Sequence, residues 1–306
     1  GVFKSVDGGE SWSEINNGIT GLNVGSIAID PQTPTTLYVG MTPGGVFKSV
    51  DGGESWSEIN NGLTGLYVTT IAINPQTPST LYVGTVNTGI FKSVNGGQSW
   101  NTFNSGLTTF GILTLAIDPQ TPTTLYAGTY EYGMFKSVNG GRWSRINYGL
   151  TGNTIDSLVI DPQSQTTLYA GTRDDGIFKS DNGGESWSEI NNGITGLNVG
   201  SIAIDPRTPS TLYAGTLGDG VFKSDNYAES WREVNFGFLG NSIQAIAIDP
   251  KTPTTLYAGT LESGVYKSSN GGGSWHWISY GLTERDISCL AIDPLTPSTL
   301  YAGVGL

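Results

Sequence analysis

Short apolar runs alternate with clusters of turn-forming residues along the whole chain. Residues 24–29 read Val-Gly-Ser-Ile-Ala-Ile, and residues 36–40, 45–49 and 55–59 are three further runs rich in β-branched and aromatic side chains. Pro, Gly, Asn, Asp and Thr fill the intervals between the runs, which is typical of tight turns. Because no run keeps the 3.6-residue apolar period of a helix, the pattern predicts four short strands and no helix.

The four-strand pattern repeats seven times. The phrase Gly-Val-Phe-Lys-Ser, with small changes, opens units at residues 1, 45, 89, 133, 176, 220 and 264. The spacing is 44 residues except for one step of 43, because the fourth unit lacks one residue in Gly-Gly-Arg-Trp. Four strands in about 40–45 residues form one blade of a β-propeller. The sequence therefore predicts an all-β, seven-bladed β-propeller with four antiparallel strands per blade, and residues 1–306 as one domain.

The two ends of the chain complement each other. The chain starts in a third strand (Gly1–Ser5) and finishes after a second strand (Thr299–Gly303). We therefore expect the N- and C-termini to share a blade, in a 2+2 strand clasp that closes the ring and leaves no free sheet edge. A stacked solenoid is the alternative, but solenoids need polar terminal caps, and both ends here are ordinary repeat sequence.

Composition excludes several classes of protein and site. Hydrophobic residues make up 37% of the chain, and no apolar run reaches the length that spans a bilayer. The formal charge of −12 disfavours nucleic acid and anionic membranes as partners. One cysteine (Cys289) and one histidine (His276) allow neither an internal disulfide nor a His/Cys zinc site. We expect no metal and no cofactor, and we expect Cys289 to pack as a small apolar residue on an inner strand.

A motif follows each third strand: Ser-x-Asp-x-Gly-x-x-Trp, as in Ser5, Asp7, Gly9 and Trp12. It resembles the Asp-box, or BNR repeat, of sialidases, xyloglucan-degrading glycoside hydrolases, sortilin-type receptors and the photosystem II assembly factor. The resemblance covers all seven units and implies a propeller more strongly than it implies any activity. The motif positions expected to have a structural role are Asp7, Asp51, Asn95, Asn139, Asn182, Asn226 and Asn270, with Trp12, Trp56, Trp100, Trp143, Trp187, Trp231 and Trp275.

The motif has a physical interpretation as a turn lock. The Asp or Asn oxygen can accept backbone N–H groups inside the hairpin, and Gly adopts a conformation that is costly for other residues. The Trp ring can fill a large apolar space in the core while its N–H donates a hydrogen bond. The oxygen-rich stretch 180–185 also fits a calcium loop, but we favour the turn-lock interpretation. In the sixth unit, where Tyr227 intrudes and Ala228 replaces Gly, we expect a distorted turn.

The seven units differ mainly on one predicted face. In an up-and-down blade, the turns after the first and third strands share a face, and both barely vary between units. The loops after the second strand and between blades lie on the opposite face and do vary, which favours a binding surface there; unconstrained drift is the alternative. The ligand-binding candidates on this face are Tyr67, Phe110, Tyr130, Glu131, Tyr132, Asp156, Arg173, Asp174, Gln244, Glu262, Arg285 and Asp286.

The leading interpretation is a non-catalytic binding module for a glycan or a protein surface, because aromatic rings beside carboxylates suit sugars and cationic peptides. One alternative is a structural propeller without a specific ligand, engineered or amplified by copying, since Gly8–Pro31 and Gly183–Pro206 are identical. The second alternative is a glycoside hydrolase, with Glu131 and Asp174 as a candidate carboxylate pair. The variable face has too few arginines for the clamp of a sialidase.

The remaining expectations concern assembly and location. We expect a monomer that does not insert into a membrane. No Asn-x-Ser/Thr acceptor site occurs, which disfavours a glycosylated eukaryotic ectodomain and favours a bacterial protein. The chain begins inside a strand without Met or a signal peptide, as expected of a mature fragment. The Asp-box resemblance implies a secreted or cell-surface location.

Overall fold

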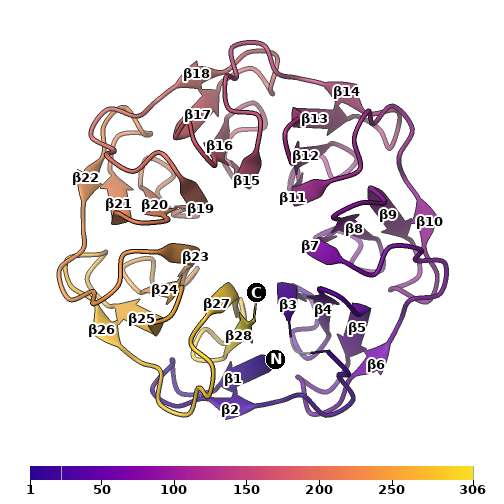
Figure 1. Ribbon diagram of the computed structural model, residues 1–306, viewed down its shortest axis with the longest axis horizontal. Helices are drawn as coiled ribbons and strands as arrows, with labels where there is room; N and C mark the ends of the chain where they lie inside the picture. The colour runs from indigo at the N-terminus through magenta and orange to yellow at the C-terminus, as the bar shows by residue number, and fades with distance from the viewer. Residues whose placement is uncertain (22, 306) are drawn as a thin grey trace.

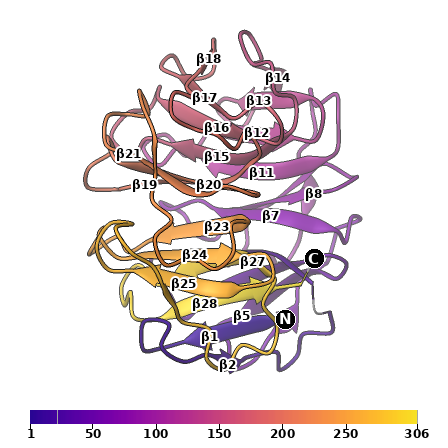
Figure 2. The same cartoon turned by 60° about the vertical axis from the view of Figure 1, so that its left-hand side comes forward.

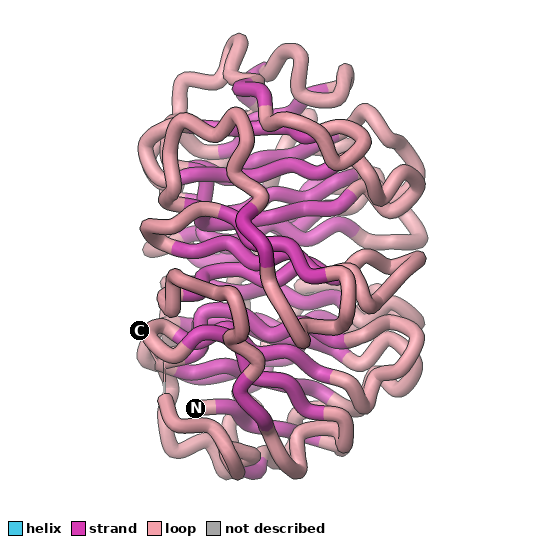
Figure 3. Tube along the Cα trace, turned by 90° about the vertical axis from the view of Figure 1, so that its right-hand side faces the viewer, coloured by secondary structure: helices cyan, strands magenta, loops and turns pink. Residues whose placement is uncertain are grey.

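Seven four-stranded sheets surround a central channel in the computed structural model, which describes residues 1–21 and 23–305 (Figure 1). In each sheet the strands pair antiparallel, from an inner strand beside the channel to a short outer strand at the rim. The described residues form strands, turns and loops but no helix, so none of them lies in a helix that could cross a membrane (Figure 3). The prediction of an all-β, seven-bladed propeller is confirmed.

The strands fall into four classes by their place in the blade. The inner strands are β3 (Val24–Ile29), β7 (Val68–Ile73), β11 (Ile112–Ile117), β15 (Ile155–Ile160), β19 (Val199–Ile204), β23 (Ile243–Ile248) and β27 (Ile287–Ile292). The second strands are β4 (Leu37–Met41), β8 (Leu81–Thr85), β12 (Leu125–Thr129), β16 (Leu168–Thr172), β20 (Leu212–Thr216), β24 (Leu256–Thr260) and β28 (Leu300–Val304).

The two remaining classes complete each blade toward the rim. The third strands are β5 (Gly45–Ser49), β9 (Ile90–Ser93), β13 (Gly133–Ser137), β17 (Ile177–Ser180), β21 (Gly220–Ser224), β25 (Gly264–Ser268) and β1 (Val2–Ser5). The outer strands are β6 (Ser57–Glu58), β10 (Asn101–Thr102), β14 (Ser144–Arg145), β18 (Ser188–Glu189), β22 (Arg232–Glu233), β26 (His276–Trp277) and β2 (Ser13–Glu14).

One blade is built from both ends of the chain. Its strand order is β2-β1-β28-β27, with Val2 opposite Gly303 and Ser5 opposite Leu300. The N–H of Val304 adds a hydrogen bond to the carbonyl of Gly1 at 2.9 Å. The two ends of the chain lie close together in both ribbon views (Figures 1 and 2). The predicted 2+2 strand clasp is therefore confirmed.

The connections between strands gather on two opposite faces of the ring (Figure 3). On the turn face, the Asp-box turn contacts the turn after the inner strand, as where the N–H of Gly52 donates to the carbonyl of Thr35 at 2.8 Å. On the loop face, the loop after a second strand contacts the linker that enters the next blade, as where the N–H of Gly44 donates to the carbonyl of Leu66 at 2.8 Å. The repeat therefore separates two kinds of connection in space.

A hydrogen bond from each repeated tryptophan joins neighbouring blades. Trp56 is buried, and its indole N–H donates to the carbonyl of Ile15 in the preceding blade at 2.7 Å. The equivalent bond recurs at the other junctions at 2.7–2.9 Å, with Trp12, Trp100, Trp143, Trp187, Trp231 and Trp275 as donors. Because the N–H is paired, the large ring can be buried between two blades without an unsatisfied donor.

The side chains of the Asp-box hold the turn itself. Asp7 Oδ1 accepts the backbone N–H of Ser11 at 3.0 Å, and Ser5 Oγ accepts the N–H of Gly9 at 2.8 Å while donating to Asp7. These bonds satisfy backbone donors that the tight turn leaves unpaired, which is the role that the sequence interpretation gives to the motif.

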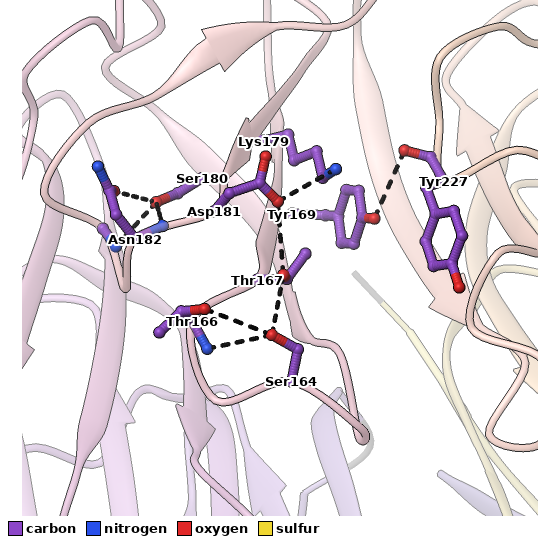
Figure 4. A network of polar contacts seen from close by, with 10 residues as sticks. Ser164, Thr166, Thr167, Tyr169, Lys179, Ser180, Asp181, Asn182 and Tyr227 are labelled. Atoms are coloured by element: carbon purple, nitrogen blue, oxygen red, sulfur yellow. Dashed lines mark hydrogen bonds and ion pairs between the residues drawn. The ribbon is translucent and has the colours of Figure 1, made fainter.

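The blade of β15–β18 shows how the turn face connects to the next blade (Figure 4). Lys179 Nζ lies 3.1 Å from Asp181 Oδ1, and the Tyr169 hydroxyl donates to the carbonyl of Tyr227, in the turn of the sixth unit, at 3.5 Å. In other units the equivalent lysine reaches the next turn directly, as where Lys48 Nζ donates to the carbonyl of Gly96 at 3.1 Å. The turn face is thus tied together by contacts that cross from blade to blade.

The sixth-unit turn keeps its shape, so the expected distortion is wrong. Tyr227 and Ala228 adopt φ values of 58° and 67°, the left-handed region that glycines occupy in other units. The N–H of Ala228 still donates to Ser224 Oγ at 2.9 Å. The turn that departs belongs to the fourth unit, where one residue is missing: Asn139 has a φ of 54°, and its Oδ1 accepts the hydroxyl of Thr123 at 3.3 Å.

Replacement of a junction tryptophan tests the contribution of its hydrogen bond to stability. Trp100→Phe leaves the carbonyl of Ile59 without the indole donor, so we expect a loss of about 1–3 kcal/mol in the free energy of unfolding, besides lost packing. The matched control is Trp277→Phe, whose ring lies half exposed on β26 and whose N–H donates to the carbonyl of Ser263 at 3.0 Å. Because water can replace this exposed bond, we expect a change within about 0.5 kcal/mol. Urea denaturation measures both, and equal losses in the two variants would contradict the assignment.

Acid stability tests the aspartates of the turn lock. Hydrogen bonds from the side chains of Ser11 and Ser55 lower the pKa of Asp7 and Asp51 to about 2, from 3.8. Their folded-state pKa lies below the unfolded value, so their stabilisation is fully present above about pH 4 and is lost as the pH falls through 2. We expect the double variant Asp7→Asn/Asp51→Asn to lose less thermal stability between pH 4 and pH 2 than the parent chain does.

The control for this acid experiment is Glu58→Gln, on the exposed face of β6. It should keep the acid sensitivity of the parent chain, because Glu58 is not part of a turn lock. An acid sensitivity that the double aspartate variant leaves unchanged would show that these two carboxylates do not stabilise the turns.

Candidate functional site

One backbone hydrogen bond recurs at every blade of the loop face. The first residue after each second strand donates its N–H to the carbonyl of the residue just before that blade's inner strand, at 2.9–3.2 Å. The donor–acceptor pairs are Thr42–Asn23, Val86–Tyr67, Tyr130–Gly111, Arg173–Thr154, Leu217–Asn198, Leu261–Ser242 and Gly305–Asp286. The loop face therefore has the same backbone frame in all seven blades.

Each inner strand also carries a β-bulge at its second residue. In β3, Val24 pairs with Met41 and Ser26 pairs with Gly40, which leaves Gly25 out of register. The seven bulge residues are Gly25, Thr69, Leu113, Asp156, Gly200, Gln244 and Ser288. All seven are partly exposed, whereas the residue before each is buried. Bulges re-aim side chains, and these residues lie at the loop-face end of the channel.

Three positions per blade thus combine a fixed backbone with a changing side chain: the last linker residue, the bulge residue and the first loop residue. Across the seven blades they hold ten residue types, namely Asn, Gly, Thr, Tyr, Val, Leu, Asp, Arg, Ser and Gln. The last residue of the inner strand, in contrast, is Ile in all seven blades. We call the three positions the variable positions. Side-chain diversity on a constant frame is what a binding surface requires.

Four aromatic candidates share neighbouring blades and form what we call the aromatic stripe: Tyr67, Phe110, Tyr130 and Tyr132. All four side chains are close to half exposed. Two of them are joined by the loop after β8, since the carbonyl of Tyr67 accepts the N–H of Val86 and the carbonyl of Phe110 accepts that of Gly89. Tyr130 and Tyr132 lie in the loop after β12, where the N–H of Tyr130 donates to the carbonyl of Gly111. The two loops belong to neighbouring blades. In Figure 1 these are the blades of β7–β10 and β11–β14.

The stripe ends at a fixed arginine. The guanidinium of Arg173 donates to both carboxylate oxygens of Asp156, at 3.1 Å and 2.8 Å, and its central carbon lies 5.7 Å from the centre of the Tyr130 ring. Hydrogen bonding to Asp156 raises the pKa of Arg173, which keeps the guanidinium charged. Asp156 therefore anchors Arg173 beside the aromatic ring, with both of its oxygens engaged.

Two exposed acids flank the same corner of the loop face. The N–H of Glu131 donates to Thr154 Oγ1 at 3.2 Å, and the N–H of Arg173 donates to the carbonyl of Thr154 at 3.1 Å. Glu131 and Asp174 therefore project from two loops that meet at one linker residue, and both side chains are exposed. The structure thus brings Glu131 and Asp174 to the corner where Arg173 binds Asp156 and lies beside the Tyr130 ring.

The remaining candidates lie elsewhere on the ring. Glu262, Arg285 and Asp286 belong to the blade of β23–β26 and the linker that follows it, on the other side of the channel from the stripe (Figure 1). The N–H of Glu262 donates to Asp286 Oδ1 at 2.7 Å, and the guanidinium carbon of Arg285 lies 5.7 Å from the Trp277 ring centre. Gln244 belongs to neither group, because it is a bulge residue at the channel mouth.

Two features bear on chemistry at the site. Within residues 1–21 and 23–305, His, Cys, Asp and Glu form no group of three or more that could hold a metal ion. Burial raises the pKa of the Cys289 thiol to about 11, so the thiol stays protonated and β27 presents no reactive thiolate there.

The sequence candidates omitted most of the bulge residues. Thr69, Leu113 and Ser288 share the position of Asp156 and Gln244 but were not identified, because alternation alone assigns the second strand residue to the blade interior. A usable signal was present: this position holds six residue types in the seven units, whereas the residue before it is Val or Ile throughout.

No protein-family model and no curated protein matches the chain. Among solved structures, the GH74 xyloglucanase from Xanthomonas campestris is similar, with a TM-score of 0.77 and 19% identity over 93% of this chain and 51% of that one. The extracellular domain of a hybrid two-component system from B. thetaiotaomicron has a TM-score of 0.74 and 16% identity over 94% of this chain and 41% of that one.

A third similar structure, YCF48 bound to D1 peptide, has a TM-score of 0.70 and 13% identity over 95% of this chain and 94% of that one. The chain thus spans about half the length of the xyloglucanase and nearly the whole of YCF48. At these identities the likeness concerns the fold, and it agrees with the propeller that the strand pattern predicts.

Proposed function

We propose that the chain is a non-catalytic binding module whose ligand, a glycan or a protein surface, lies on the loop face across the aromatic stripe. One observation carries the proposal: side-chain diversity is concentrated at the variable positions, on a backbone frame that repeats in every blade. Such a frame fixes the position of each side chain before a ligand arrives, which reduces the entropy lost on binding.

The chemistry of the stripe suits a ligand with flat or cationic groups. Half-exposed Tyr and Phe rings offer apolar surfaces on which sugar rings or side chains can stack, and the tyrosine hydroxyls add hydrogen bonds. Glu131 and Asp174 supply exposed carboxylates beside them, while Arg173 is already paired with Asp156. The face therefore attracts neutral or positively charged ligands more than anionic ones.

The similar proteins support a binding role and a location. YCF48, whose length this chain nearly matches, forms a complex with the D1 peptide. The two-component-system domain is extracellular. By analogy with these folds, we propose a protein or glycan partner for this chain, and a secreted or cell-surface location.

A glycoside hydrolase is the second candidate, because two exposed acids from loops joined at Thr154 stand at the end of an aromatic stripe. Glu131 and Asp174 would be the acid and the base or nucleophile of such an enzyme, as the carboxylate-pair mechanism requires. The similarity to a GH74 xyloglucanase makes soluble xyloglucan the first substrate to test.

The aromatic stripe is tested by a double replacement. We screen the parent chain against a glycan array and a peptide library, and we measure the strongest hit by calorimetry. Tyr130→Ala/Tyr132→Ala should weaken that binding at least tenfold, about 1.4 kcal/mol, because two stacking surfaces are lost. The thermal midpoint should stay near that of the parent chain, since both rings are half exposed.

The matched control is Tyr148→Ala/Tyr280→Ala, which removes two exposed tyrosines from the outer rim. This control should bind like the parent chain. Absence of any hit, or equal weakening in the control, would contradict binding at the stripe. Release of reducing ends from xyloglucan, abolished by Glu131→Gln or Asp174→Asn, would establish the enzyme instead.

A further inference from the structure

The loop-face end of the central channel contains a cavity of about 270 Å³. Its walls come from four consecutive blades, with Gly25, Thr69, Gln244 and Ser288 among the lining residues, together with Thr42 of a neighbouring loop. The four strand residues are all bulge residues, so the irregularity of the inner strands shapes this cavity. This volume is just below the range of about 300–1,000 Å³ that ligand pockets span, so the cavity has room for one small molecule.

Three hydroxyl groups line the cavity, and each donates its proton to a backbone carbonyl. Ser288 Oγ donates to the carbonyl of Val24 at 2.6 Å, and Thr69 Oγ1 donates to the carbonyl of Ile112 at 2.6 Å. Thr42 Oγ1 donates to the main chain of the next blade in the same way, at 3.0 Å. A hydroxyl has one proton and two lone pairs, so these three oxygens remain available only as acceptors.

Gln244 is one of two side-chain amides among the lining residues, the other being Asn23. Gln244 is half buried, and its side chain makes no hydrogen bond to any residue in the described part of the chain. An amide offers two N–H donors and a carbonyl acceptor, so Gln244 can bind either kind of polar group. No charged side chain is among the residues that line the cavity, so a bound ion would lack a counter-charge there.

From this arrangement we infer that the channel mouth binds one uncharged polyhydroxy compound, which donates hydroxyl protons to Thr42, Thr69 and Ser288 and pairs with the amide of Gln244. The acceptor-only hydroxyls select a ligand rich in O–H donors, and the uncharged lining selects a neutral one. The inference goes beyond the proposed function, because it uses none of the residues of the aromatic stripe.

Two sources of such a ligand are a single sugar ring and an acyclic alditol. Saturation-transfer-difference NMR and calorimetry on the full chain distinguish them, with methyl β-D-glucopyranoside and methyl β-D-galactopyranoside as ring probes and sorbitol as the acyclic probe. Glucosamine and glucuronate serve as the cationic and anionic counterparts. We expect binding of at least one neutral probe and weaker binding of both charged probes.

Two variants locate the binding. Gln244→Leu removes the amide and should weaken the neutral probe at least tenfold, and Gln244→Phe should abolish binding by filling the cavity. Gln76→Leu, on the turn face, is the matched control and should bind like the parent chain. Unchanged thermal midpoints establish that the variants fold.

Three results would overturn the inference: no binding of any neutral probe, stronger binding of a charged probe, or equal affinity in Gln244→Leu and Gln76→Leu. Each is distinguishable from failure of the proposed function, because the array ligand at the stripe is tested with Tyr130 and Tyr132 variants that leave Gln244 intact. If the chain binds its array ligand but no polyol, the proposed binding module stands and only the channel site is wrong.

Discussion

The indole N–H that crosses from one blade to the carbonyl of the preceding blade is the interaction on which the ring depends. A propeller blade is too small to bury both faces alone, so each sheet needs its neighbours, and the bond recurs at 2.7–2.9 Å around the ring. Lysine side chains add further contacts, since Lys4 and Lys48 reach carbonyls in the turn of the next blade. Every junction thus uses the same tryptophan bond, and a change at one tryptophan affects two blades at once.

This constraint explains why side-chain diversity is found mainly on one face. The turn face carries the locks that hold Trp and Lys in position, so its sequence is almost the same in all seven units. On the loop face, a backbone hydrogen bond such as Thr42–Asn23 recurs in all seven blades, and a backbone bond places no demand on the side chain. Side-chain bonds such as Arg173–Asp156 are added to this frame in single blades. Stability and recognition are therefore assigned to opposite ends of the same strands.

Much of the fold could be predicted from the sequence, because seven copies of one pattern indicate the same four strands. The part-copies at the two ends of the chain indicate the clasp. The turn at Ala228 shows the limit of local propensity, because its backbone is left-handed even without glycine.

The candidate site was less predictable from the sequence than the fold. The bulge at Gln244 breaks the alternation from which burial is inferred, and the pairing of Arg173 with Asp156 joins residues 17 apart through a geometry that only the folded blade creates.

The most direct test of this division is a symmetrised chain. In this variant the three variable positions of every blade carry Asn, Gly and Leu, the residues found at 198, 200 and 217 in the fifth unit. The account predicts a monomeric β-protein whose thermal midpoint stays close to that of the parent chain and which has lost the ligand that the parent chain binds. A symmetrised chain that unfolds, or one that keeps the ligand, would contradict the separation of stability from recognition.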